Sequence, residues 1–218
     1  MQRLRLTFAK TAAMRYTGHL DLHTTWERTL RRARLPLAYS QGFHPQPKIQ
    51  LASALPLGFT SECEVADVWL ETTQELAEAR AQLERAAQPG LVITEVIEAP
   101  ESAPKLQVAL RSAEYQVIIA SPLIAEALDE GIRALLAQLT IIRIRREKKY
   151  DLRPLIESLA RAASDELGHT LVMQLAAREG ATGRPEEVVE ALNHSAAEAR
   201  FHRTKLIFTG NDVDSPTT

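Results

Sequence analysis

The sequence predicts an α+β fold in which two ferredoxin-like-type halves pack together, the first of them with one extra strand. Three observations predict it: short runs alternate apolar and polar residues, apolar residues recur at helical spacing between these runs, and the same strand-helix order occurs twice. The chain has 218 residues, 45% hydrophobic and 25% charged, a composition typical of globular proteins. This length suffices for one large domain or two small ones.

The N-terminal half, residues 1–97, opens with a strand and a helix. Arg3–Phe8 alternates basic and apolar residues, the period of a half-buried strand. In the segment 18–33, Leu22, Trp26 and Leu30 recur at helical spacing, which predicts an amphipathic helix. The elements expected next are strands at Leu37–Ser40, Lys48–Ser53 and Glu64–Leu70, a helix at Gln74–Ala87 and a strand at Leu91–Ile97.

Residues 98–112 contain two prolines and no clear period, so they are predicted to be a linker, after which the order restarts in residues 113–208. The turn-like sequence DELG separates two apolar runs, of which the first fits a strand or a helix. The last ten residues, 209–218, are predicted to be a disordered tail. The elements expected in the second half are Tyr115–Ala120 (strand), Pro122–Gln138 (helix), Leu139–Arg145 (strand), Leu155–Ala162 (strand or helix), Thr170–Ala177 (strand), Pro185–Asn193 (helix) and Phe201–Phe208 (strand).

The composition excludes several classes of site. Cys63 is the single cysteine, so the chain cannot form an internal disulfide or supply the usual thiolates of an iron–sulfur or zinc centre, and we expect no metal in it. No run approaches the roughly 20 apolar residues that cross a bilayer, and charges near the N-terminus exclude a signal peptide. We therefore expect a soluble, cytoplasmic protein without a membrane partner.

A formal net charge of −2 hides a strong asymmetry along the chain. Residues 1–50 contain nine Lys and Arg against two acidic residues, whereas residues 51–140 contain five against fourteen. The first block is a candidate surface for polyanions, although a pI near 6.3 argues against a protein that coats nucleic acid.

The segment 35–58, LPLAYSQGFHPQPKIQLASALPLG, is the most informative part of the sequence. Its centre combines a glycine, two prolines, an aromatic residue and a histidine, which together continue neither a strand nor a helix and predict a rigid loop. Such loops often carry functional side chains. The candidate binding residues in and beside the loop are Tyr39, Gly42, Phe43, His44 and Lys48.

Arginines cluster at the outer end of the first predicted helix, at Arg28, Arg31, Arg32 and Arg34. Positive charge near a helix C-terminus is stabilised by the helix dipole, so these residues need no ligand. Beside an aromatic loop, however, the same charges could hold phosphates while bases stack on the rings, as in proteins that bind single-stranded RNA. Both interpretations stay open.

A second basic stretch, RIRREKKYDLRP, occupies residues 143–154. Alternation places Arg143 and Arg145 on one face of a strand and Ile142 and Ile144 on the other. This stretch is a second candidate for polyanion binding, although a solvated edge strand would show the same pattern.

His19 and His23 stand four residues apart in HLDLH, on one face of the predicted helix, with Asp21 between them. Such a pair can bind a metal, but no third ligand is evident, and exposed histidines with a dipole-stabilised aspartate explain the pattern. GHLDLHTT also resembles the Leu-Asp motif of pseudouridine synthases, although the glycine that usually follows is missing. The candidate catalytic residues are His19, Asp21 and His44.

Several segments together resemble a bacterial family, the radical S-adenosylmethionine-linked proteins. They are the N-terminal strand, HLD, ERTLRRARLPLAYSQGFHPQPKI, ALPLG and, in the second half, YDLRP, which adds Tyr150 and Arg153 to the candidate binding residues. Members occur alone or fused to radical S-adenosylmethionine domains. The resemblance therefore implies a partner that carries the iron–sulfur cluster and S-adenosylmethionine, since this chain has no CxxxCxxC.

We expect an accessory or substrate-binding module that presents RNA, or an RNA-containing complex, to a separate radical S-adenosylmethionine enzyme without catalysing a reaction itself. Arg28, Arg31 and Arg32 would hold phosphates, as would Lys48. One alternative is an RNA-processing or RNA-modifying enzyme, either a nuclease using His19 or His44, or a pseudouridine synthase using Asp21. Another is a protein-interaction module whose basic face meets an acidic partner.

Overall fold

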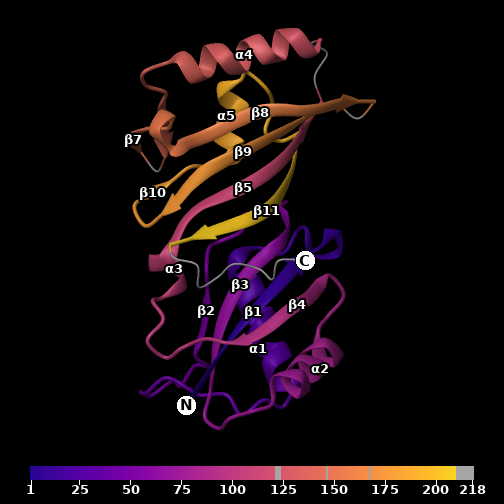
Figure 1. Cartoon of the computed structure of the whole chain (residues 1–218), viewed down its shortest axis with the longest axis vertical. Helices are drawn as coiled ribbons and strands as arrows, with labels where there is room; N and C mark the ends of the chain where they lie inside the picture. Colours follow the sequence, from indigo (N-terminus) through magenta and orange to yellow (C-terminus); the bar gives the residue numbers. More distant parts are fainter. Residues whose placement is uncertain (121–123, 146, 167, 210–218) are drawn as a thin grey trace. The chain divides into compact units, whose positions relative to one another are not determined.

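The computed structural model describes residues 1–120, 124–145, 147–166 and 168–209 (Figure 1). The chain divides into two compact units, Met1–Leu110 and Arg111–Thr218. Both units contain antiparallel strands and helices, so the chain has the α+β fold that the sequence predicts. Within the described ranges, no helix is long and apolar enough to span a membrane.

A central strand organises the first unit. The strands of this unit are β1 (Gln2–Lys10), β2 (Ile49–Leu51), β3 (Thr60–Leu70) and β4 (Leu91–Glu98). They lie in the order β2-β3-β1-β4, and every neighbouring pair is antiparallel. The alternation predicted for β1 is confirmed, because Leu4, Leu6 and Phe8 all point into one hydrophobic core.

Two helices of the first unit contribute to this core. α1 (His19–Arg32) follows a short 3-10 turn, η1 (Ala12–Met14), and α2 (Leu76–Ala86) packs against α1 and β4 (Figure 1). Leu22, Trp26 and Leu30 form the buried face of α1, as their spacing predicts. The Trp26 ring meets Phe8 edge-on, with the ring centroids 4.8 Å apart, so it fixes α1 against β1.

The opposite side of β1 carries an ion-pair network rather than a solvated basic face. Arg3, Arg5 and Asp67 of β3 are all buried, and the carboxylate accepts hydrogen bonds from both guanidinium groups. Arg3 also donates to the carbonyl oxygens of Ala103 and Pro104 at 2.7 and 3.0 Å. Two arginines of the basic N-terminal block therefore hold the unit together.

Two expected elements of the first unit differ from the structure. The expected strand Leu37–Ser40 is reduced to isolated bridges, Leu37 to Leu70 and Tyr39 to Pro47, because the prolines around it supply no backbone donor for a continuous ladder. The expected linker 98–112 contains a short helix, α3 (Leu106–Ala109), and its Leu106 is fully buried. A division of the chain into independently folding domains at this segment stays a prediction.

The second unit repeats the strand order of the first. Its sheet contains β5 (Leu110–Ile119), β8 (Ile156–Asp165), β9 (Gly168–Arg178) and β11 (Arg200–Phe208), in the order β8-β9-β5-β11. The ambiguous run before DELG is thus a strand, and β8 and β9 form a hairpin in which Asp165 pairs with Gly168. The remaining elements are α4 (Ala125–Ala137), the hairpin β6 (Ile142–Arg145) and β7 (Lys148–Asp151), the 3-10 turn η2 (Arg153–Leu155), β10 (Ala181–Thr182) and α5 (Pro185–Ala191).

The strand expected at Leu139–Arg145 is shorter in the structure. In a solvated edge strand the arginines would face the solvent, but here the isoleucines do. In β6, Ile142 and Ile144 are exposed, whereas Arg143 and Arg145 are half-buried against α5. Alternation defines two faces of a strand but not which one meets the protein. The predicted helix start at residue 122 and nearly all of the predicted tail, residues 210–218, lie outside the described residues.

Candidate functional site

The loop predicted around Gly42 projects from a closed base. The Ser40 amide donates to the Gln46 carbonyl oxygen at 2.8 Å, and the Gln46 amide donates back to Ser40 Oγ at 3.0 Å. Gly42 has a φ of 131°, a conformation that a residue with a Cβ rarely adopts. These contacts fix the base of the loop and leave residues 41–45 exposed.

Phe43 lies at the tip of this loop with its ring completely exposed, at 102% of the reference area. His44 beside it is also exposed, and Tyr39 at the base is exposed over 36% of its area. Lys48 is half-buried, and its amide donates to the Ala38 carbonyl oxygen at 2.8 Å. Because an exposed aromatic ring gains nothing from core packing, the loop presents Phe43 to solvent or to a ligand.

Arg28, Arg31 and Arg32 are exposed on α1, and none of them forms an ion pair with a side chain in the described ranges. Four other basic residues of the N-terminal block, Arg3, Arg5, Lys10 and Arg15, are engaged within the unit, whereas Arg34 is exposed just beyond α1. Lys10 is completely buried and donates to the Phe59 carbonyl oxygen at 2.9 Å, and Arg15 Nε donates to the Gly58 carbonyl oxygen at 2.8 Å. The charge available to a polyanion is therefore concentrated on the outer part of α1.

The first turn of α1 contains two of the three candidate catalytic residues, His19 and Asp21, while His44 lies on the loop. Asp21 is exposed, and its Oδ2 lies 3.6 Å from the position that a Cβ on Gly18 would occupy. Burial lowers the pKa of His19, with His23 as a second cause, while Glu64 opposes them, and His19 Nδ1 has no hydrogen-bond partner in the described part of the chain. His19 is therefore held in the neutral form near pH 7.

The remaining histidine of HLDLH is engaged by its own helix. His23 Nδ1 lies 3.2 Å from Glu27 Oε1, one turn along α1. Within the described residues, no three His, Cys, Asp or Glu side chains gather as metal ligands would. The absence of a bound metal stays a prediction.

Three residues near this turn were not predicted from the sequence: Lys10, Arg15 and Tyr16. Tyr16 is 77% exposed, and the Arg15 guanidinium lies over its ring, 5.8 Å from the centroid. Lys10 follows Phe8 on the buried face of β1, at a position where the alternation predicts a hydrophobic residue. A lysine at such a position is unusual, and this break in the pattern could have identified it.

Tyr150 and Arg153 make contacts inside the second unit. The Arg145 guanidinium lies 4.7 Å from the Tyr150 ring centroid and pairs with Glu187 of α5 at 2.7 Å, and the Tyr150 hydroxyl donates to the same carboxylate. Arg153 Nε donates to the Leu136 carbonyl oxygen at 3.0 Å. These contacts give both residues a structural role, and their role in binding stays a prediction.

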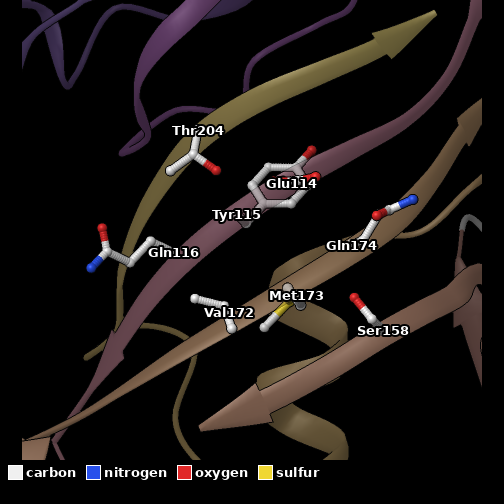
Figure 2. Close-up of a pocket in the computed structure, with 8 residues that line it drawn as sticks. All are labelled: Glu114, Tyr115, Gln116, Ser158, Val172, Met173, Gln174 and Thr204. Atoms are coloured by element: carbon white, nitrogen blue, oxygen red, sulfur yellow. The ribbon is translucent and has the colours of Figure 1, made fainter. Parts of the chain in front are cut away.

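The second unit also has a hollow of about 340 Å³ on its sheet. Its lining side chains come from β5, β8, β9 and β11, as Figure 2 shows. Glu114 is its charged lining residue, accompanied by polar side chains such as Gln116 and Gln174. A hollow lined by a carboxylate and no cation repels phosphate groups, so it does not suit a polyanion.

Comparisons with known proteins identify a family and a fold. A family model described as "Uncharacterized protein conserved in bacteria (DUF2344)" matches residues 3–185. Among solved structures, the chain is similar to a chain in a crystal structure of a Cbf5–Nop10–Gar1 complex, with a TM-score of 0.52 and 9% identity over 93% of this chain and 48% of that chain. This chain therefore spans about half the length of that one. No curated protein matches.

Two further solved structures are similar at lower TM-scores. The structure of an H/ACA RNP bound to a substrate RNA containing 2′-deoxyuridine has a chain with a TM-score of 0.43 and 8% identity, over 85% of this chain and 43% of that chain. The archaeal box H/ACA sRNP Nop10–Cbf5 complex has one with a TM-score of 0.44 and 11% identity, over 92% and 46%.

Proposed function

Since this chain belongs to the DUF2344 family of proteins conserved in bacteria, we propose that it is an accessory module that binds RNA, or an RNA-containing complex, and presents it to a separate radical S-adenosylmethionine enzyme. The observation that carries the proposal is the presence, in one compact unit, of unpaired arginines on α1 and of a completely exposed Phe43 on a loop.

The arginines supply the phosphate contacts. Arg28, Arg31 and Arg32 lie within two helical turns, and no carboxylate of the described residues neutralises them. A guanidinium donates in a fork that matches phosphate oxygens, and contacts of this kind fix an RNA strand without reading its sequence. The helix dipole explains arginines in the last turn of α1, but Arg28 lies outside that turn.

The loop supplies a stacking platform. An exposed base gains about 1–3 kcal/mol by stacking on an aromatic ring. Phe43 would therefore stabilise an RNA complex, whereas its exposed ring contributes little to the stability of the free protein. Tyr39 and His44 offer a second ring and an imidazole within the same short segment. The closed base of the loop reduces the entropy lost on binding.

The strand order supports a finer description of the fold. The order β2-β3-β1-β4 with antiparallel pairing, interrupted by α1 and α2, is that of a ferredoxin-like unit, and the order β8-β9-β5-β11 is equivalent. We describe the chain as two such units in tandem. The similarity to the chain from the Cbf5–Nop10–Gar1 complex, at 9% identity, bears on the α+β fold alone and gives no activity to this protein.

The cofactors belong to the partner in this proposal. A cluster of the radical S-adenosylmethionine type needs several thiolates, and Cys63 is the single cysteine of this chain. The segments around HLD, the loop and YDLRP resemble those of the radical S-adenosylmethionine-linked proteins. This resemblance supports a radical S-adenosylmethionine protein as the partner.

A second candidate function is RNA modification or cleavage by the chain itself. It is favoured by the first turn of α1, where an exposed Asp21 carboxylate accompanies the neutral His19. A carboxylate can act as a nucleophile and a neutral imidazole as a general base, and the exposed Tyr16 offers a ring for a base.

Incubation of the purified chain with end-labelled single-stranded RNA separates these functions. We expect retention of the RNA on the protein with no change in its length or nucleoside composition. Cleavage or a modified nucleoside, lost in Asp21→Asn or His19→Gln, would replace the binding module by an enzyme. Absence of both retention and reaction would contradict the proposal and leave an acidic protein partner for the basic face of α1.

A further inference from the structure

A hollow of about 280 Å³ lies between the C-terminal ends of α1 and α2. It is lined by Arg32, Ala33 and Arg34 on one side and by Gln82, Arg85 and Ala86 on the other. Its charged lining residues are therefore three arginines, contributed by two helix ends that are far apart in the sequence. This volume lies just below the range of pockets that hold drug-sized ligands, so it suits a small group such as one or two phosphates.

In the described residues, neither acidic residue of α2 pairs with a lining arginine. Glu84 pairs with Arg80 at 2.8 Å, and Glu78 accepts a hydrogen bond from Gln82 Nε2 at 3.2 Å. In the described residues, none of the three lining arginines forms an ion pair. Like charges gathered without a counter-ion repel one another, so an anion bound in the hollow would reduce the electrostatic repulsion between the arginines.

Arg34 has a backbone conformation that favours another residue type. It follows the C-terminus of α1 with a φ of 58°, in the left-handed region, where helices usually place glycine or asparagine. Its amide donates to the Arg31 carbonyl oxygen at 3.1 Å, which fixes this turn. A glycine would adopt the turn without strain, so the side chain of Arg34 is the feature that the fold alone does not require.

The helix dipole is the competing explanation. Arg32 and Arg85 lie in the last turns of their helices, where positive charge is favourable. The dipole, however, acts within the last turn, and Arg34 lies beyond it. The two explanations differ in a measurable way, because charges placed only to complement a dipole create no saturable site for an added anion.

We propose that this hollow is a phosphate-binding site that holds a phosphate of the RNA bound along α1. The inference rests on the proposed function, and the site would position the RNA strand at the C-terminal end of α1. Arg34 and Arg85 line the hollow from two helix ends, and Arg32 belongs both to the hollow and to the row of arginines on α1. A terminal phosphate and a backbone phosphate share this chemistry.

The first test uses inorganic anions and no RNA. The melting temperature of the full chain is measured with increasing orthophosphate or pyrophosphate, against chloride at matched ionic strength. We expect a saturable rise with phosphate, larger with pyrophosphate, that is lost in Arg85→Gln and kept in Arg178→Gln, which removes the same charge from an exposed position of β9 in the second unit. A rise that is equal in chloride, or that persists in Arg85→Gln, overturns the site.

Arg34→Gly keeps the test valid if other variants fold poorly. Because glycine suits a φ of 58°, we expect this variant to melt at or above the wild-type temperature while its response to pyrophosphate falls. A purely structural arginine predicts the reverse, with a lower melting temperature and an unchanged response.

The second test compares single-stranded RNA with and without a 5′-phosphate. We expect Arg85→Gln to raise the Kd for both RNAs roughly tenfold, and a larger effect on the phosphorylated RNA would identify a terminal phosphate. RNA binding that is unchanged in Arg85→Gln, together with a phosphate response that is lost, overturns the RNA assignment and leaves the proposed function intact. Failure of RNA binding in the wild-type chain would instead contradict the proposed function.

Discussion

Asp67 Oδ1 accepts a hydrogen bond from Arg5 Nε at 2.9 Å, and both side chains are buried in the first unit. Arg3 Nε donates to the other carboxylate oxygen at 3.0 Å. We expect Asp67→Ala to lower the free energy of unfolding by about 3–5 kcal/mol, because it leaves two buried guanidinium groups without their carboxylate. Urea denaturation of the variant measures the loss.

Glu71→Ala is the matched control for Asp67, since this exposed carboxylate follows the same strand. It should change the free energy of unfolding by less than about 0.5 kcal/mol. Equal effects of the two substitutions would mean that Arg3 and Arg5 are not held by Asp67, and both would return to the candidate polyanion surface.

His19 should make stability depend on pH. Burial lowers its pKa below the ordinary value of 6.5, so the folded state disfavours the protonated form that the unfolded state accepts. The stability associated with neutral His19 is fully present above pH 6.5 and is lost as the pH falls through the lowered pKa. Melting temperatures between pH 7.5 and 5 should therefore fall less steeply in His19→Gln than in the wild type; equal slopes would refute this assignment.

Glu187 should stabilise the second unit without affecting RNA. Its carboxylate pairs with Arg145 at 2.7 Å and accepts the Tyr150 hydroxyl hydrogen bond. We expect Glu187→Gln to cost about 1–3 kcal/mol of unfolding free energy, because a half-buried guanidinium loses its charged acceptor, and to leave the Kd for RNA unchanged. Tighter RNA binding in this variant would show that Arg145 belongs to the binding surface.

The arginines of α1 should determine the salt dependence of RNA binding. We expect the combined Arg31→Ala and Arg32→Ala substitutions to weaken binding and to reduce the slope of log Kd against log salt by about 1.4, since each phosphate contact on a single strand contributes about 0.7. Filter binding between 50 and 200 mM salt provides the slope. An unchanged slope would place the phosphate contacts elsewhere in the chain.

The sequence predicted the elements whose pattern is local. Helix α1 was predictable because the spacing of Leu22, Trp26 and Leu30 defines its buried face. The exposed loop around Phe43 was predictable from its glycine and prolines, which exclude regular structure.

Features that depend on distant partners were not predictable. Arg5 was expected on a half-buried strand, but its burial depends on Asp67, which is 62 residues away. The inward face of β6 depends on Glu187, 42 residues beyond Arg145, and the position of Arg34 and Arg85 on one hollow depends on how two helices pack. Alternation and charge counts carry no information about such contacts.

The stacking role of Phe43 is the central claim, and the Kd of Phe43→Ala for single-stranded RNA, measured together with its melting curve, tests it most directly. Leu57→Ala is the control, because Leu57 is an exposed apolar residue in another loop of the same unit. We predict that Phe43→Ala weakens binding by about 1–3 kcal/mol while the free energy of unfolding changes by less than about 0.5 kcal/mol, and that Leu57→Ala changes neither. Normal affinity in Phe43→Ala, or a loss of affinity that only follows a loss of stability, would contradict the account.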